Sequence, residues 1–130
     1  MLKSGFILNP AINSVISRVR HTNTLVIADR GFPYWPQIET VDISLTDDVP
    51  TVLQVLRCLR QAANFGSVFM ASEFRLVNPP GSLQQFEEAL SGLQLTVEPH
   101  SEFKKRVPNA IALIRTGDTT QYANLILESA

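Results

Sequence analysis

The chain has 130 residues, of which 45% are hydrophobic and 18% are charged. This length and composition predict one globular domain over residues 1–130 whose core needs neither disulfides nor a metal, and they exclude a disordered chain. Its 11 basic and 12 acidic residues give a net charge of -1, which excludes the basic surface typical of proteins that bind nucleic acid or anionic membranes. No apolar run approaches the roughly 20 residues of a membrane span, and the first residues lack the apolar core of a signal peptide, so we expect a cytoplasmic protein.

The spacing of apolar residues predicts alternating helices and strands. In chain order the predicted elements are a helix over 10–20, strands over 24–28 and 41–44, a helix over 49–63, a strand over 68–71, a helix over 82–92, a strand over 93–97, a short helix over 102–106, and strands over 110–115 and 122–127. Asn9 and Pro10 fit the N-cap and the first position of the first helix. Ser82 and Gln85 fit a capping box for the third long helix.

This order of elements predicts a layered α/β domain, because helices alternate with apolar strands. The turn sequence TGDTTQ at 116–121 joins the last two strands, which favours an antiparallel pair in a mixed sheet. The lone cysteine, Cys58, stands between Leu56 and Leu59, so we expect it to be a buried structural residue and not a reactive thiol.

His21 and Asp29 stand at the two ends of the apolar run over 24–28. Histidine exchanges protons near neutral pH, but His21 also follows a predicted helix closely enough to act only as a cation at its C-terminal end. Asp29 ends a strand and begins a loop, where an aspartate either lines a ligand crevice or caps the loop backbone through an Asx-turn. Position alone leaves a structural and a functional role open for both residues.

A second polar group lies near the end of the chain. Lys104 follows His100 by four residues, so a short helix would place both on one face. Tyr122 and Asn124 are two apart in a predicted strand and would therefore point to the same side. These side chains can hydrogen-bond the hydroxyls of a sugar, although a tyrosine such as Tyr122 also suits the rim of a core. The sequence has no glycine-rich phosphate loop, no CxxC pair and no zinc-ligand spacing, so we expect no cofactor and no metal.

Several segments together resemble the family of D-ribose pyranases and L-fucose mutarotases. They are RHTNTLVIADRGFP, VDISL, ASEF, HSEFKK and RTGDTTQYANLIL, and the resemblance extends from Leu8 to Leu127. HSEFKK followed by RTG and YAN resembles the ribose branch more than the fucose branch. The resemblance implies a three-layer α/β/α fold with a mixed sheet, a ring-shaped homodecamer, and a monosaccharide site between subunits.

By the same resemblance, His21 matches the catalytic proton donor of the family. The positions that match its sugar-binding residues are Asp29, His100, Lys104, Tyr122, Ala123 through its backbone, and Asn124. The chain departs from the family's usual glycine, aspartate, small residue and proline at Arg20, Asn23, Arg30 and Gln121. Arginines beside His21 and Asp29 would lower the pKa of the histidine, bind a charged sugar, or pair with acids of a neighbouring subunit.

The implied activity is that of an isomerase, a mutarotase that opens and recloses a monosaccharide ring without a cofactor. The implied substrate is D-ribose, interconverted between its β-pyranose and β-furanose forms. A histidine that protonates the ring oxygen fits general acid–base catalysis, which is typically worth about 10²- to 10⁴-fold in rate. Two alternatives stay open: a protein of a sugar-uptake pathway that binds a monosaccharide without turning it over, and a structural subunit whose polar cluster only satisfies an interface.

Overall fold

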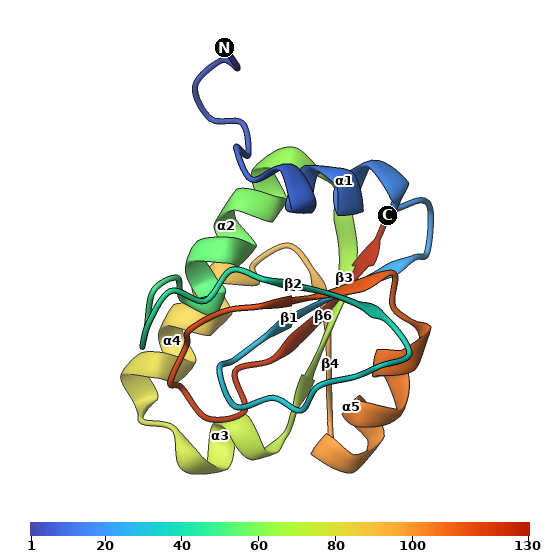
Figure 1. Ribbon diagram of the computed structural model, residues 1–130. Coiled ribbons are helices and arrows are strands. Elements are labelled where there is room, and N and C mark those ends of the chain that lie inside the picture. Colours follow the sequence, from blue (N-terminus) through green and yellow to red (C-terminus); the bar gives the residue numbers. More distant parts are fainter.

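A computed structural model describes residues 1–130 and contains one six-stranded sheet in the order β2-β5-β1-β6-β3-β4 (Figure 1). The strands are β1 (Thr24–Ala28), β2 (Glu39–Asp42), β3 (Phe65–Ala71), β4 (Gln94–Glu98), β5 (Ala112–Arg115) and β6 (Leu125–Ser129). β6 runs antiparallel to both of its neighbours, β1 and β3, whereas the other three pairings are parallel. The predicted mixed sheet is therefore confirmed.

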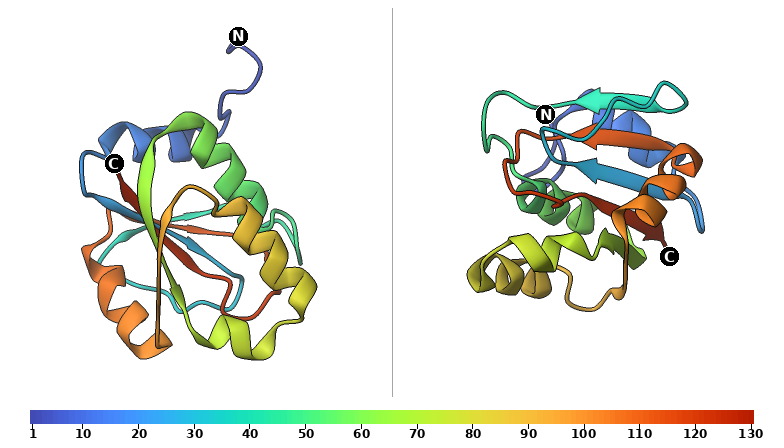
Figure 2. Two further views of the ribbon diagram at one scale, coloured as in Figure 1. Left: turned by 180° about the vertical axis from the view of Figure 1, so that it is seen from behind. Right: turned by 90° about the horizontal axis from the view of Figure 1, so that it is seen from below.

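Helices cover both faces of this sheet (Figure 2). They are α1 (Pro10–Arg18), α2 (Val52–Ala62), α3 (Glu73–Val77), α4 (Pro80–Ala89), α5 (His100–Arg106) and a 3-10 turn, η1 (Val107–Asn109). Successive side chains of β1 alternate between the faces, so Leu25 and Ile27 join the large core with α1, α2 and α4. Val26 and Ala28 join a smaller core with α5. The predicted three-layer α/β/α arrangement is confirmed.

β1 lies between β5 and β6, so the predicted direct pairing of the last two strands is wrong. Residues Leu25 to Ala28 are fully buried, and a strand that is apolar on both faces suits the centre of a sheet. The connection over 116–124 passes the end of β1, where the side chain and the backbone of Thr116 both donate to the carbonyl of Ala28, at 2.8 and 2.9 Å. The last two strands still run in opposite directions, but across β1.

Two helix starts differ in how well the sequence predicted them. α1 begins at Pro10 with its N-cap as predicted. The predicted capping box at Ser82 is wrong, because α4 already begins at Pro80, where a missing backbone N–H costs no helical hydrogen bond. A capping box forms instead between Thr51 and Gln54 at the start of α2.

Other differences bear directly on the site. The short helix α3 over Glu73–Val77 was not predicted, and α5 begins at His100 and not at 102. β6 begins at Leu125, which leaves residues 122–124 in a loop. Cys58 is exposed, contrary to expectation, because it lies outside the buried side of α2. That buried side consists of Val52, Leu53, Val55, Leu56 and Leu59.

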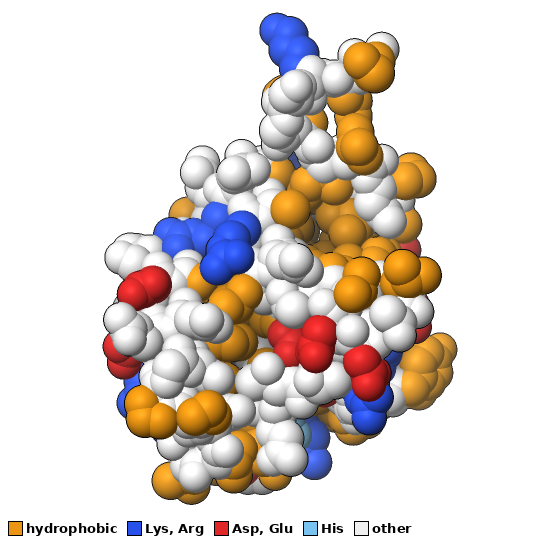
Figure 3. Space-filling model, turned by 90° about the vertical axis from the view of Figure 1, so that its left-hand side faces the viewer, with side chains coloured by type: hydrophobic (Ala, Val, Ile, Leu, Met, Phe, Trp, Pro, Cys, Tyr) orange, Lys and Arg blue, Asp and Glu red, His pale blue; other side chains and the backbone are white.

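The segment before α1 extends from the body of the molecule (Figures 1 and 3). It carries four exposed apolar side chains, Met1, Leu2, Phe6 and Leu8. Figure 3 shows apolar side chains around a hollow below it, and a cavity of about 360 Å³ lies there between this segment, α1 and α2. Exposed apolar surface of this kind is typical of contacts between protein chains. None of the helices is both long and apolar enough to cross a bilayer.

Candidate functional site

A small pocket lies where β1 ends, beside the start of α5 and the loop that enters β6. Its volume is about 230 Å³, and its lining residues are Asp29, Gly31, Phe32, Pro33, His100, Gln121, Tyr122 and Asn124. In open α/β sheets, ligands bind outside the carboxyl ends of the strands, and this pocket has that position. Four of the predicted sugar-binding residues, from three distant parts of the chain, therefore line one cavity.

Asp29 combines both roles that the sequence left open. Its Oδ1 accepts a hydrogen bond from the backbone N–H of Gly31 at 3.0 Å, which is an Asx-turn, and its own N–H donates to Oδ1 of Asn124 at 2.7 Å. Burial raises the pKa of the Asp29 carboxyl above its usual value, although hydrogen bonds from the backbone of Gly31 and Phe32 oppose the change. A partly buried carboxyl that lines a pocket is a typical ligand-binding group.

Asp29→Asn is expected to raise the melting temperature near pH 7 but not near pH 3. Because the folded chain holds the Asp29 proton more tightly than the unfolded chain, stability falls as the pH rises from the ordinary value of 3.8 through the raised pKa. Asparagine keeps an oxygen that can accept the Gly31 N–H and carries no charge to desolvate. Thermal unfolding of both proteins at the two pH values measures the effect, and an equal gain at both would show that burial of the charge is not its cause.

Arg115, at the end of β5, forms hydrogen bonds with the loop that carries Asp29. Its guanidinium donates to the carbonyl of Asp29 at 3.2 Å and to that of Pro33 at 3.2 Å. Sequence analysis missed this residue, because only the pairing of β1 with β5 brings Ala28 opposite Arg115. These two hydrogen bonds hold the backbone on both sides of the Asx-turn, and so fix where the Asp29 carboxyl lies.

His100 begins α5, and aromatic rings surround its side chain. The imidazole stacks on Phe103 with 5.9 Å between ring centroids and makes edge contacts with Phe32 at 6.0 Å and Tyr122 at 5.1 Å. Burial of the ring, followed by the positive charge of Lys104, lowers the pKa of His100 below its usual value. Its surroundings therefore favour the neutral imidazole.

Glu73, in α3, holds the backbone of His100 and is a second residue that sequence analysis missed. Both of its carboxylate oxygens accept the N–H of His100, at 3.0 and 3.1 Å. Desolvation raises the pKa of Glu73, but this hydrogen bond, together with hydrogen bonds from its own N–H and from the Ser72 hydroxyl, leaves the pKa below its ordinary value. The only signal in the sequence is the acid of the ASEF segment, which gives no hint of its contact with His100.

The loop before β6 places the remaining side chains. Tyr122 was predicted in a strand, but it lies in this loop. Its φ of 56° is a left-handed conformation that is uncommon for residues other than glycine. Tyr122 and Asn124 therefore reach the same pocket through the loop conformation and not through strand alternation. Asn124 is 3% exposed and Ala123 fully buried. Asn78 donates to the carbonyl of Gln121 at 2.9 Å and ties this loop to the end of α3.

Lys104 lies beside the pocket and not in its wall. It lines a neighbouring groove of about 510 Å³ together with Trp35 and Lys105, and that groove shares Pro33 with the pocket. Lys104 acts on the pocket through its charge, which contributes to the low pKa of His100.

His21 lies at the other end of β1, away from the pocket. The five residues of β1 alone span about 17 Å at roughly 3.3 Å per residue. The side chain of His21 is exposed in the loop that follows α1. Within one chain, the structure therefore does not bring His21 to the residues that it was expected to assist.

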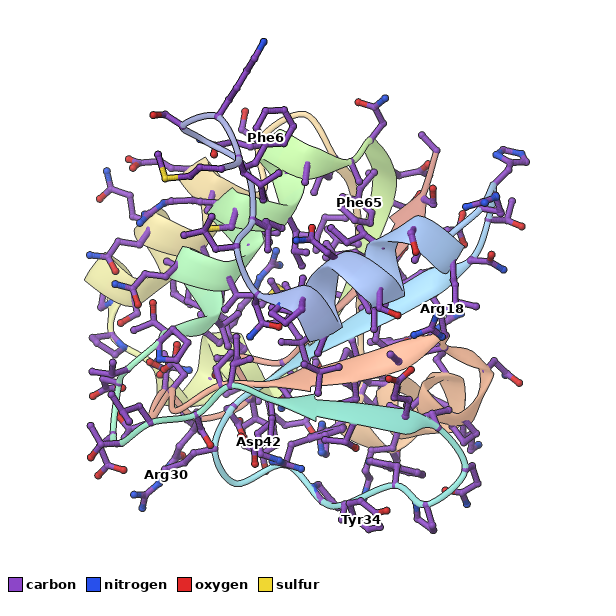
Figure 4. The ribbon with its side chains drawn as sticks, turned by 45° about the horizontal axis from the view of Figure 1, so that its top comes forward. Phe6, Arg18, Arg30, Tyr34, Asp42 and Phe65 are labelled. Atoms are coloured by element: carbon purple, nitrogen blue, oxygen red, sulfur yellow. The ribbon has the colours of Figure 1, made fainter.

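Neither unusual arginine lines the pocket. The guanidinium of Arg20 donates to the carbonyls of Ser17 and Val19, and Arg18 donates to that of Ser14, so these two arginines place cations at the end of α1. Arg30 points outward (Figure 4) and forms an exposed ion pair with Asp47 of the same chain.

The fold and the pocket together define a small α/β protein with a polar, aromatic-walled pocket that suits a ligand rich in hydroxyl groups. The chain belongs to the RbsD / FucU transport protein family, whose model matches residues 1–130. D-ribose pyranase of Proteus mirabilis is 32% identical over 98% of this chain and 97% of its own length. D-ribose pyranase of Clostridium novyi is 33% identical over 98% of this chain and 97% of its own.

Solved structures show the same fold. Bacillus subtilis RbsD, solved in complex with D-ribose, matches with a TM-score of 0.91 and 29% identity over 99% of this chain and 98% of that one. The fucose mutarotase of Streptococcus pneumoniae, solved in complex with L-fucose, matches with a TM-score of 0.80 and 18% identity over 95% and 93% of the two chains. At 18% identity, the match to the fucose mutarotase shows only that the two proteins share a fold.

Proposed function

We propose that this protein is a sugar mutarotase, an isomerase that interconverts the ring forms of D-ribose. The observation that carries the proposal is the pocket, which gathers Asp29, His100, Tyr122 and Asn124 in a chain about one third identical to D-ribose pyranases over nearly its full length. These groups can bind the hydroxyls of one sugar ring. The pocket volume of about 230 Å³ suits a monosaccharide better than a larger sugar.

Mutarotation needs two proton transfers. The anomeric hydroxyl loses a proton while the ring oxygen gains one, the ring opens to an aldehyde, and a hydroxyl then recloses it. When a different hydroxyl recloses the ring, the pyranose becomes a furanose. We assign the proton donor to His21. Within one chain, His21 and the pocket lie at opposite ends of β1, so the donor must be the His21 of a second copy of the chain.

The site therefore requires an oligomer, which we propose to be a ring-shaped decamer. The exposed apolar segment before α1 and the apolar cavity beside it provide surface for contacts between copies. Sedimentation equilibrium measures the assembly directly. A protein that is monomeric at the concentrations where it is active would contradict a site shared between copies.

The native protein is expected to accelerate the exchange between ribose pyranose and furanose forms. Saturation-transfer NMR measures this exchange in solution without a coupled enzyme, and fucose and galactose in parallel samples measure specificity. The expected result is faster exchange for ribose than for the other two sugars. Exchange at the uncatalysed rate for all three would contradict mutarotase activity.

The separation of His21 from the pocket also favours a second candidate, a protein that binds a monosaccharide without turning it over. Calorimetry distinguishes the two functions. Heat of ribose binding together with uncatalysed exchange would support the binding protein, whereas binding with accelerated exchange supports the mutarotase.

A further inference from the structure

We propose that Nε2 of His100 is the base that takes the proton from the anomeric hydroxyl, so that His100 is a catalytic residue and not only a sugar ligand. This inference rests on the proposed mutarotase function. General acid–base catalysis of ring opening needs a donor and an acceptor of protons on the two oxygens of the anomeric carbon. His21 of a second copy accounts for the donor, and the pocket itself must provide the acceptor.

The surroundings of His100 leave one ring nitrogen for a ligand. Nδ1 is buried and makes no hydrogen bond. Nε2 also makes no hydrogen bond, but it is not buried, and the His100 side chain lines the pocket. The stacked ring of Phe103 and the edge contacts with Phe32 and Tyr122 hold the imidazole in this orientation. A sugar hydroxyl can therefore reach Nε2 and not Nδ1.

The charges that face His100 suit a group that gains a proton during the reaction. They are Glu73 behind the start of α5, Asp29 across the pocket and Lys104 one turn further along α5, and the Tyr122 hydroxyl group is the remaining titratable neighbour. Burial favours the neutral form of the free imidazole, which is the form that accepts a proton. The two carboxylates then stabilise the imidazolium once it has formed, as the acid of a catalytic triad does for its histidine.

Asp29 is the other acid–base group in the pocket, and its hydrogen bonds make it the weaker candidate for the base. Its Oδ1 already accepts the N–H of Gly31 at 3.0 Å, and this Asx-turn holds the carboxylate against the backbone of its own loop. Nε2 of His100 has no such partner. We therefore assign proton transfer to His100 and stabilisation of the imidazolium to Asp29.

The step balances without any further reagent. Nε2 of His100 takes the proton of the anomeric hydroxyl, the electrons of that O–H bond form the carbonyl, and the bond from the anomeric carbon to the ring oxygen breaks. Its electron pair goes to the ring oxygen, which takes a proton from His21 of a second copy. When a hydroxyl attacks the carbonyl, the two histidines exchange protons with the sugar in the reverse sense.

Chemical rescue tests this assignment. His100→Ala is expected to slow ribose exchange by about 100-fold or more at saturating ribose, and added imidazole is expected to restore part of the rate. At a fixed pH the restored rate should rise with the concentration of neutral imidazole, because the missing group is a base. If the alanine variant unfolds, His100→Gln, which retains much of the ring volume, measures the loss of rate without the rescue. Lys105→Ala, on the exposed side of the same helix, is the matched control and should keep the native rate.

Two results would overturn the assignment. One is a His100→Ala protein with the native rate at saturating ribose and only a raised KM, which would make His100 a ligand. The other is an Asp29→Asn protein that loses the rate and is rescued by formate, together with a His100→Ala protein that imidazole does not rescue, which would make Asp29 the base. The proposed function fails separately, through uncatalysed exchange by the native protein.

Discussion

His21→Ala is expected to slow ribose exchange by about 10²- to 10⁴-fold and to leave the melting temperature unchanged. The side chain of His21 is exposed and makes no hydrogen bond within its own chain, so its loss removes no interaction that stabilises the fold. Saturation-transfer NMR measures the rate, and thermal unfolding measures the stability. A variant that exchanges ribose as fast as the native protein would remove His21 from the mechanism.

The position of His21 makes a second, sharper prediction about mixed oligomers. His21→Ala and Asp29→Asn are each expected to be inactive, but oligomers assembled from equal amounts of the two should regain roughly one quarter of the native rate. Half of the histidines and half of the pockets are then intact and meet at random across the interface. The matched control is a mixture of Asp29→Asn with His100→Gln, which should stay inactive because both side chains belong to the pocket of one chain. Equal recovery in both mixtures would contradict a site shared between copies.

The sequence predicted the parts of the site that depend on local order along the chain. Asp29 was expected at the carboxyl end of an apolar strand, and the pocket does lie there. Lys104 was expected in a short helix over 102–106, and α5 contains that helix but begins earlier, at His100. Strand ends and short helices follow from the pattern of a few neighbouring residues, so these predictions needed no knowledge of the strand order.

What the sequence could not predict depends on contacts between distant segments. Arg115 reaches the Asp29 loop only because β5 lies beside β1, and Glu73 reaches His100 only because β3 pairs with β4. The prediction for Tyr122 was wrong for a related reason. A residue with a positive φ breaks the alternation of a strand, and nothing in the local apolar pattern marks that conformation.

The two arginines beside His21 and Asp29 show the same limit. Because Arg20 stands next to His21 and Arg30 next to Asp29 in the sequence, both were expected to act on the site. In the structure, Arg20 binds the carbonyls at the end of α1 and Arg30 pairs with Asp47. Both interactions are exposed, and an exposed ion pair such as that of Arg30 with Asp47 contributes little to stability. Within one chain, neither arginine gives a reason to expect a charged sugar in place of ribose.

Gly117→Ala is expected to lower the free energy of unfolding by about 3 kcal/mol and to weaken ribose binding. A Cβ at this position would lie 2.1 Å from the carbonyl oxygen of Thr46, and backbone cannot yield as a flexible side chain can. The N–H of Gly117 donates to the carbonyl of Pro50 at 3.0 Å, and its own carbonyl accepts the N–H of Asp48 at 2.6 Å. The substitution must therefore displace the loop over 116–124, which carries one wall of the pocket.

Denaturant unfolding measures the loss of stability, and calorimetry with ribose measures the loss of affinity. Gly81→Ala is the matched control, because nothing lies within 4 Å of a Cβ there and alanine favours a helix such as α4 by up to about 1 kcal/mol. If Gly117→Ala unfolds at the native midpoint, the loop accommodates a methyl group and the pocket wall does not depend on this close approach. If stability falls but the affinity for ribose holds, the loop recovers its position beside β1 through Thr116 and the hydrogen bond from Asp29 to Asn124.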